Sequence, residues 1–169
     1  LLEKQGFENY EISNFAWPGR ECRHNLGYWW LDPYLGVGPA AVGTLPSLDG
    51  GPVRLSNPAR LERYLTGAAG GWGLQAEQIA PRDFLLENLM MGLRLREGIS
   101  EAVFVRRFGA GLPQLLPGLW ASWQRRGLLR PGQGSYALTE PARLRLNPLL
   151  VEASAALESA DPRLAALWP

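Results

Sequence analysis

The order of the apolar patterns over residues 82–138 constrains the fold more than any other feature. Three helical patterns and then a hairpin pattern follow one another, at residues 82–96, 101–108, 115–127 and 128–138. Ser100 is placed to cap the second helix, and a Pro-Gly turn interrupts the hairpin. Three helices followed by a hairpin predict a winged-helix-like unit, and a last helix is expected over residues 148–157.

A change in composition divides the chain. Residues 66–73 read TGAAGGWG, the most flexible composition in the chain. We therefore predict a domain boundary there, with one domain over residues 1–70 and a mostly helical one over residues 71–169. Because the N-terminal part carries strand patterns, the expected fold class is α+β.

The N-terminal part combines short strands with loops. Strands are expected over residues 7–15 and 35–42, and no period holds between Arg20 and Pro33, which predicts a binding loop. A hairpin over residues 43–56 and a helix over about 59–65 complete this part.

Composition excludes several classes of protein. With 46% hydrophobic and 20% charged residues, the chain is typical of globular proteins and not of disordered ones. No apolar run reaches the roughly 20 residues that span a bilayer, and no leader is visible, so we expect a cytoplasmic protein. The single cysteine, Cys22, can form neither an intrachain disulfide nor an iron-sulfur cluster by itself. The first residue is not Met, which suggests a piece of a longer protein.

The only histidine lies among aromatic residues, and this set suggests a haem site. Cys22, His24 and Tyr28 offer the thiolate, imidazole and phenolate groups that ligate haem iron. Arg20 and Arg23 can pair with propionates. The alternative is structural, with His24 hydrogen-bonded to backbone and the aromatic rings in a core.

Other polar residues are less specific. Gly36 and Gly38 lie in a stretch that lacks the βαβ context of a nucleotide fingerprint. That stretch is either a strand packed closely against a neighbour or a strand end that contacts a ligand. Ordinary hydrogen-bonded or solvated carboxylates are expected at Glu8, Glu11 and Asp32. A solvated helix face is expected at Glu87, Arg94 and Arg96.

Residues 100–145 carry seven arginines against Glu101 and Glu140, which raises nucleic-acid binding as a rival function. The third predicted helix would offer polar side chains to DNA, namely Gln114, Ser122, Gln124, Arg125 and Arg126. We give this interpretation less weight than haem binding.

Several motifs resemble one family in the same order. YEISNFA, PG, CRHNLGYW and DPYLGVGPAA precede ENLMMGLRLREGIS, a helix pair and a wing. Together they are similar to radical S-adenosylmethionine (SAM) proteins related to oxygen-independent coproporphyrinogen III oxidase, and particularly to the HemW branch. The resemblance implies that residues 1–70 contain late strands of a partial barrel and that a HemN-type helical domain follows.

The resemblance also implies a function. In the HemW branch, haem is bound and handed to haem-accepting proteins, and the HNxxYW motif associated with haem is here His24, Asn25, Tyr28 and Trp29. His24 would be the imidazole ligand of the metal. The enzymatic alternative is the oxidase, which decarboxylates a porphyrinogen.

Two cofactors of the family belong to the rest of such a protein. The 4Fe–4S cluster and its bound SAM depend on a three-cysteine loop that this chain lacks, so radical chemistry is not expected from it alone. Gly36 and Gly38 are expected near the SAM end of the barrel. The family's GxGPGAHS reads GVGPAAVG here, without its histidine. A barrel cut in this way would leave an unpaired edge, so residues 1–70 should cover the C-terminal helices or self-associate.

Overall fold

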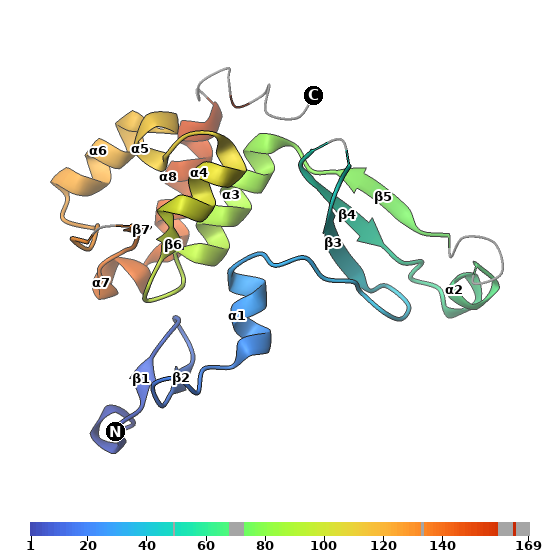
Figure 1. Ribbon diagram of the computed structural model, residues 1–169, viewed down its shortest axis with the longest axis horizontal. Helices are drawn as coiled ribbons and strands as arrows, with labels where there is room; N and C mark the ends of the chain where they lie inside the picture. The colour runs from blue at the N-terminus through green and yellow to red at the C-terminus, as the bar shows by residue number, and fades with distance from the viewer. Residues whose placement is uncertain (49, 68–72, 133, 159–163, 165–169) are drawn as a thin grey trace.

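The chain folds into the expected mixture of helices and strands, which confirms the α+β class (Figure 1). The computed structural model describes residues 1–48, 50–67, 73–132, 134–158 and 164. The N-terminal elements are the 3₁₀ helix η1 (Glu3–Gln5), β1 (Glu8–Asn9), β2 (Phe15–Ala16), α1 (Arg23–Trp29), β3 (Val42–Pro46), β4 (Pro52–Ser56), α2 (Leu61–Gly67) and β5 (Gln75–Gln78). The C-terminal elements are α3 (Pro81–Gly92), β6 (Ile99–Ser100), α4 (Glu101–Phe108), α5 (Leu112–Leu115), α6 (Pro117–Arg125), β7 (Ser135–Tyr136), α7 (Glu140–Arg143) and α8 (Leu146–Glu158).

The winged-helix-like arrangement is confirmed between α3 and β7. β6 pairs antiparallel with β7, and an isolated bridge joins Leu129 to Leu138 across the wing. As predicted, the Ser100 hydroxyl caps α4, because it accepts a hydrogen bond from the Val103 N–H.

Two helix boundaries differ from the prediction. α3 ends at Gly92, where an added Cβ would lie 2.3 Å from the Ile99 side chain, and the chain then leaves the helix to bridge Leu95 with Glu11. The third predicted helix is divided into α5 and α6, because Pro117 excludes helical backbone at Leu116, whose φ is −131°.

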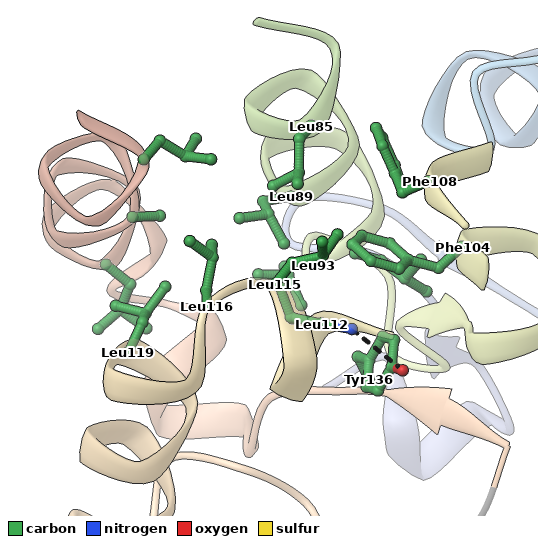
Figure 2. Packing of buried hydrophobic residues seen from close by; sticks show 14 of the residues in the cluster. Leu85, Leu89, Leu93, Phe104, Phe108, Leu112, Leu115, Leu116, Leu119 and Tyr136 are labelled. Carbon is green, nitrogen blue, oxygen red and sulfur yellow. Dashed lines mark hydrogen bonds between the residues drawn. The ribbon is translucent and has the colours of Figure 1, made fainter. Parts of the chain in front are cut away.

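The buried residues of the hydrophobic core lie between Ile79 and Leu164 in the described part of the chain (Figure 2). Ile12 and Leu31, which are partly buried, pack against this core from the N-terminal part. Leu85 and Leu89 of α3, Phe104 of α4 and Trp123 of α6 are all completely buried. Tyr136 closes one side of this core, and its hydroxyl accepts a hydrogen bond from the Leu112 N–H. This core explains why α3 to α8 form one compact unit.

The N-terminal strands differ more from the prediction. Residues 7–15 form no continuous strand, because the chain turns between β1 and β2 to bury Glu11. Residues 35–41 are a loop, since Gly38 has φ +104° and β3 begins only at Val42. α1 occupies the middle of the predicted binding loop.

The predicted hairpin is present as β3 and β4, and β5 adds a third strand that the sequence patterns did not suggest. All pairings between the described strands are antiparallel, and these strands form no closed barrel. In Figure 1 this sheet and α2 extend away from the helical core.

The predicted boundary at residues 66–73 includes residues 68–72, which lie outside the described part of the chain. Among the described residues, no helix has the length and apolar character needed to cross a bilayer.

Candidate functional site

Helix α1 carries the HNxxYW residues and has one outward and one inward face. Cys22 precedes the helix in extended conformation and is exposed, as are Arg23 and His24. The helix therefore begins with a thiol, a guanidinium and an imidazole that are all accessible to solvent.

The outward face is a file of three rings. The His24 and Tyr28 rings meet edge to face with centroids 5.0 Å apart, as expected for side chains four positions apart on a helix. The Tyr28 ring meets Tyr34 in the same way at 4.9 Å. Both contacts have the geometry that aromatic quadrupoles favour.

The inward face is anchored to the C-terminal unit through Trp29. The Arg94 guanidinium lies 4.4 Å from the centre of the Trp29 ring, and an Arg94 Nη2–Glu11 Oε2 ion pair of 2.9 Å holds it there. Trp29 is half-buried, and its indole N–H has no hydrogen-bond partner among the described residues. Trp29 is thus separated from the exposed His24 file, and Asn25 is also half-buried.

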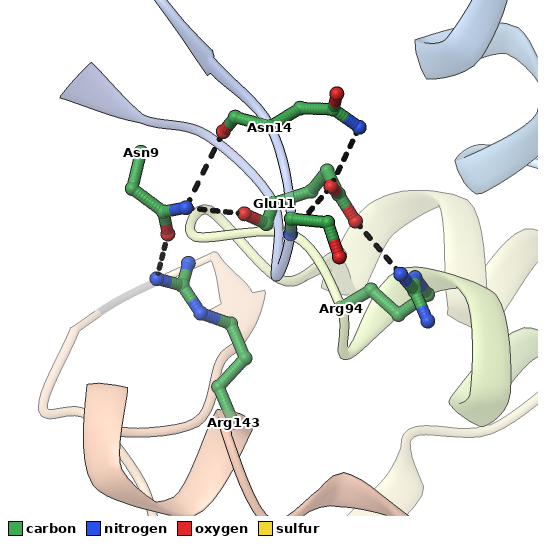
Figure 3. Close-up of polar contacts among 6 residues, drawn as sticks. Asn9, Glu11, Asn14, Arg94 and Arg143 are labelled. Atoms are coloured by element: carbon green, nitrogen blue, oxygen red, sulfur yellow. Dashed lines mark hydrogen bonds and ion pairs between the residues drawn. The ribbon is translucent and has the colours of Figure 1, made fainter. Parts of the chain in front are cut away.

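Glu11 is the centre of a buried polar network (Figure 3). Its carboxylate is completely buried and accepts hydrogen bonds from the Ser13 N–H at 2.6 Å and from Asn14 Nδ2 at 2.7 Å, besides the pair with Arg94. Asn9 extends the network to Arg143 of α7. Burial is the main cause that lowers the pKa of Arg143. The expectation of a solvated face at Arg94 was wrong, because its guanidinium pairs with a carboxylate from a distant part of the chain.

A second arginine fixes the end of α1. Arg107 of α4 donates to the Trp30 carbonyl at 2.7 Å and to Asn88 Oδ1 at 2.7 Å. Leu31 follows with φ +56°, a conformation that is strained for a leucine. Burial lowers the pKa of Arg107, Asp32 opposes this shift, and Arg106 adds to it. The guanidinium thus satisfies a C-terminal carbonyl of α1 and ties the helix to the core.

Further ion pairs join the two parts of the chain. Arg96 pairs with Glu8 at 2.6 Å on the surface, and Glu87 of α3 pairs with Arg54 of β4. The predicted solvated face was therefore wrong at Glu87, whereas Arg96 is exposed as expected but lies beyond the end of α3. Sequence reasoning missed Glu11, Arg94 and Arg107 as residues that position α1. Glu11 lies with Ser13 on the polar side of the short alternation with Tyr10 and Ile12, so no sequence pattern marked Glu11 as buried.

The two glycines predicted near a ligand lie in a close approach of two backbone segments. A Cβ on Gly36 would lie 2.5 Å from the Val42 carbonyl oxygen, so only glycine fits there. Gly38 has φ +104°, and the Asn57 side chain donates to the carbonyls of both glycines, at 3.1 and 2.9 Å. This is the close backbone packing that was one of the two expected interpretations.

Comparisons with known proteins agree with this arrangement. The HemN C-terminal domain family model matches residues 79–145, which contain the core from α3 to α7. Residues 79–145 belong to this family. The chain as a whole is HemW-like in sequence. It is 30% identical over 85% of its length to "Heme chaperone HemW" of Bacillus subtilis and 30% identical over 89% to that of Escherichia coli.

A third relative is the HemW of Synechocystis, at 39% identity over 60% of the chain. The chain spans between about a quarter and two fifths of the length of these relatives, namely 37%, 39% and 24%. A solved structure, coproporphyrinogen III oxidase (HemN) from Escherichia coli, described as a radical SAM enzyme, has a TM-score of 0.61. The superposition covers 90% of this chain and 38% of the HemN chain. At 15% sequence identity, this likeness shows the fold alone.

Within the HemN C-terminal domain, α6 does not present the basic face of a DNA reader. Trp123 is completely buried and donates to Glu152 of α8 at 3.0 Å. Arg126 pairs with the same carboxylate at 2.7 Å, which lowers the pKa of Glu152. Arg125 and Gln124 remain exposed. Within the described part of the chain, Arg125 is the one arginine of this helix without an ion pair, which is a weak basis for nucleic-acid binding.

The donor set of α1 fits haem and not an iron-sulfur cluster. An exposed thiol, imidazole and phenol are the side-chain types that ligate haem iron. A cluster needs several thiolates, and the chain contains one cysteine. No group of three or more His, Cys, Asp or Glu side chains suited to a metal occurs among the described residues.

Proposed function

We propose that the protein binds haem on the outward face of α1, with His24 as the ligand of the iron. The observation that carries this proposal is the exposed imidazole at the end of the His24–Tyr28–Tyr34 ring file. Helix α1, which carries His24, is short, but two contacts fix it to the C-terminal unit. Arg94 lies over the Trp29 ring, and Arg107 donates to the Trp30 carbonyl. Because the helix is already fixed in place, His24 would lose little conformational entropy when it coordinates the haem iron.

Each residue of the proposed site has a distinct role. Haem, when bound, supplies an iron that the imidazole of His24 coordinates. Cys22 and Tyr28 are the candidates for a second ligand, and the exposed guanidinium of Arg23 suits a propionate. Asn25 adds an amide next to the histidine. Trp29 supports the site by keeping α1 against Arg94.

The proposed biological role is haem delivery. HemW relatives are named heme chaperones, so we propose that the longer protein passes haem to haem-accepting proteins in the cytoplasm. In the longer protein the 4Fe–4S cluster and SAM would be held outside this chain, with Gly36 and Gly38 near SAM. Residues 1–70 and 71–169 would then be separate domains, and self-association through the edge strands β3 and β5 stays a prediction for light scattering.

The second candidate is a coproporphyrinogen III oxidase activity of the longer protein. It is favoured by the TM-score of 0.61 to HemN, but that likeness concerns the fold, whereas the sequence relatives are named chaperones. Porphyrinogen turnover by a full-length protein would favour the oxidase. We rank nucleic-acid binding lower, because α6 lacks a basic face.

The test is a haem titration followed by Soret absorbance. His24→Ala should weaken haem binding by about tenfold or more, since groups that only orient a metal ligand already change affinity by about 10- to 100-fold. Gln124→Ala, on exposed α6, is the matched control and should leave the titration unchanged. Tyr28→Phe separates phenolate ligation from ring packing.

Two results would contradict the proposal. If His24→Ala binds haem as tightly as the unaltered chain, the ligand lies elsewhere. If the folded chain shows no saturable Soret shift, haem binding requires the rest of the longer protein.

A further inference from the structure

A cleft on the other side of α1 is separate from the His24 face. It has a volume of about 560 Å³ and lies between the end of α1 and the α3, β6, α4 and wing segments. Cavities of roughly 300–1,000 Å³ are typical of small-molecule sites. None of Cys22, His24 and Tyr28 lines it.

The charges that line this cleft are unbalanced toward arginine. Arg106, Arg107 and Arg130 line it, against Asp32 and Glu97. The hydrogen bonds of Arg107 are used by Asn88 and by the Trp30 carbonyl, and Glu97 accepts one from the Trp30 indole at 2.9 Å.

The side chains of Arg106 and Arg130 are exposed and have no hydrogen bond or ion pair within the described ranges. Their positive charge also acts on neighbouring arginines, since Arg106 contributes to the lowered pKa of Arg107 and Arg130 to that of Arg143. Two unpaired guanidinium groups at one cleft favour an anion with two or more oxygens.

The remaining walls are apolar and aromatic. Ile99, Val103 and the two indoles of Trp29 and Trp30 line the cleft. The Trp29 indole N–H is buried without a partner among the described residues, an arrangement that costs free energy unless an acceptor reaches it. An apolar ring system with an attached anionic group matches these walls.

We propose that the cleft between α1 and α4 binds a small aromatic anion, whose carboxylate or phosphate group pairs with Arg106 and Arg130 and whose ring contacts Trp30. This inference is independent of haem binding at His24. It assigns a ligand to the side of α1 where Trp29 lies, away from His24 and Tyr28.

Calorimetric titration at low salt tests the proposal with three probes that share a ring. 2-Naphthoate and 2-naphthyl phosphate carry the anion, and 2-naphthalenemethanol is the neutral control. At least one anion should bind saturably and about tenfold or more tighter than the alcohol, because charge-assisted hydrogen bonds are the strong ones. The tighter anion identifies the class of ligand.

Substitutions locate the binding site. The double variant Arg106→Gln/Arg130→Gln should lose about tenfold or more of the anion affinity, since charged hydrogen bonds are removed. Both residues are exposed, so the fold should be kept, and a circular dichroism spectrum checks this. Arg125→Gln, an exposed arginine outside the cleft, and His24→Ala should both bind the anion unchanged.

Three outcomes would overturn the proposal. The alcohol could bind as tightly as the anions, or the double variant could bind them as the unaltered chain does. Haemin could also displace naphthoate equally from the unaltered chain and from His24→Ala. That last result would place haem in the cleft and remove the distinction between two sites.

Discussion

The parts of the chain before and after residues 68–72 keep their structure by different means. The C-terminal part buries leucine and aromatic side chains from α3 to α8 in one core. In the N-terminal part, the buried positions among the described residues are Glu11, Ala16, Gly43 and Pro52. Residues 1–34 place only Ile12 and Leu31 against the core as partly buried apolar side chains among the described residues. Their polar links to it are made by arginines, namely Arg94, Arg96, Arg107 and Arg143. A core unfolds as a unit, whereas an arginine-held segment can open locally.

The largest expected effect compares two tryptophans. Trp123 is completely buried, and Trp17 is 55% exposed. Trp123→Ala should lower the free energy of unfolding by about 3–5 kcal/mol, as large-to-small core substitutions do. Trp17→Ala should cost about 1 kcal/mol or less. Urea denaturation measures both, and equal losses would contradict the comparison between the two parts.

The next effect breaks the Glu11 anchor. Glu11→Gln removes the charge that pairs with Arg94 and should cost about 3 kcal/mol, as the loss of one partner of a buried pair does. We expect residues 7–34 to open locally while α3 to α8 stay folded. Hydrogen exchange should show lost protection in residues 7–34 alone. Glu8→Gln, in a half-exposed pair with Arg96, should cost less than about 1 kcal/mol.

A smaller effect is expected at the end of α1. Arg107→Gln removes the hydrogen bonds to the Trp30 and Leu31 carbonyls and should cost about 2 kcal/mol of local stability. Amide exchange in α1 should accelerate more than in β3 and β4. Arg106→Gln, on the same helix, is the matched control and should leave exchange in α1 unchanged.

The smallest effect concerns pH and the core. Burial is the main cause that raises the pKa of Tyr136, so the folded state favours the neutral phenol. The associated stability is present below the pKa of an unfolded tyrosine, about 10, and is lost as the pH rises through the higher folded value. Urea midpoints at about pH 8 and about pH 11 should fall more for the unaltered chain than for Tyr136→Phe. A larger fall of the urea midpoint in Tyr136→Phe than in the unaltered chain would contradict a raised pKa of Tyr136.

The sequence allowed accurate prediction where apolar periodicity sets the structure. The wing, the Ser100 cap and the last helix follow from local patterns that the core then reinforces. The end of α3 and the turn at Glu11 were missed, because both depend on contacts between positions more than 80 residues apart, such as Arg94 with Glu11. Single-sequence patterns contain no information on such pairs.

The candidate site was predictable only in part. The spacing of His24 and Tyr28 implies that they share a side once a helix is assumed, but periodicity over residues 20–33 gave no sign of that helix. The contact of Trp29 with Arg94 could not be predicted, since the two residues are far apart in the sequence. The arginine-rich middle of the chain suggested a partner, whereas several of these arginines join parts of the chain to one another.

The close approach of Gly36 to Val42 has a mechanical consequence. The Tyr34 and Thr44 backbones exchange two hydrogen bonds, of 3.0 and 2.9 Å, directly beside it. These hydrogen bonds join the β3–β5 sheet to Tyr34, whose ring contacts Tyr28. The Tyr28 ring in turn contacts His24. A tilt of the sheet would therefore displace Tyr34 and, through it, the Tyr28 and His24 rings on α1.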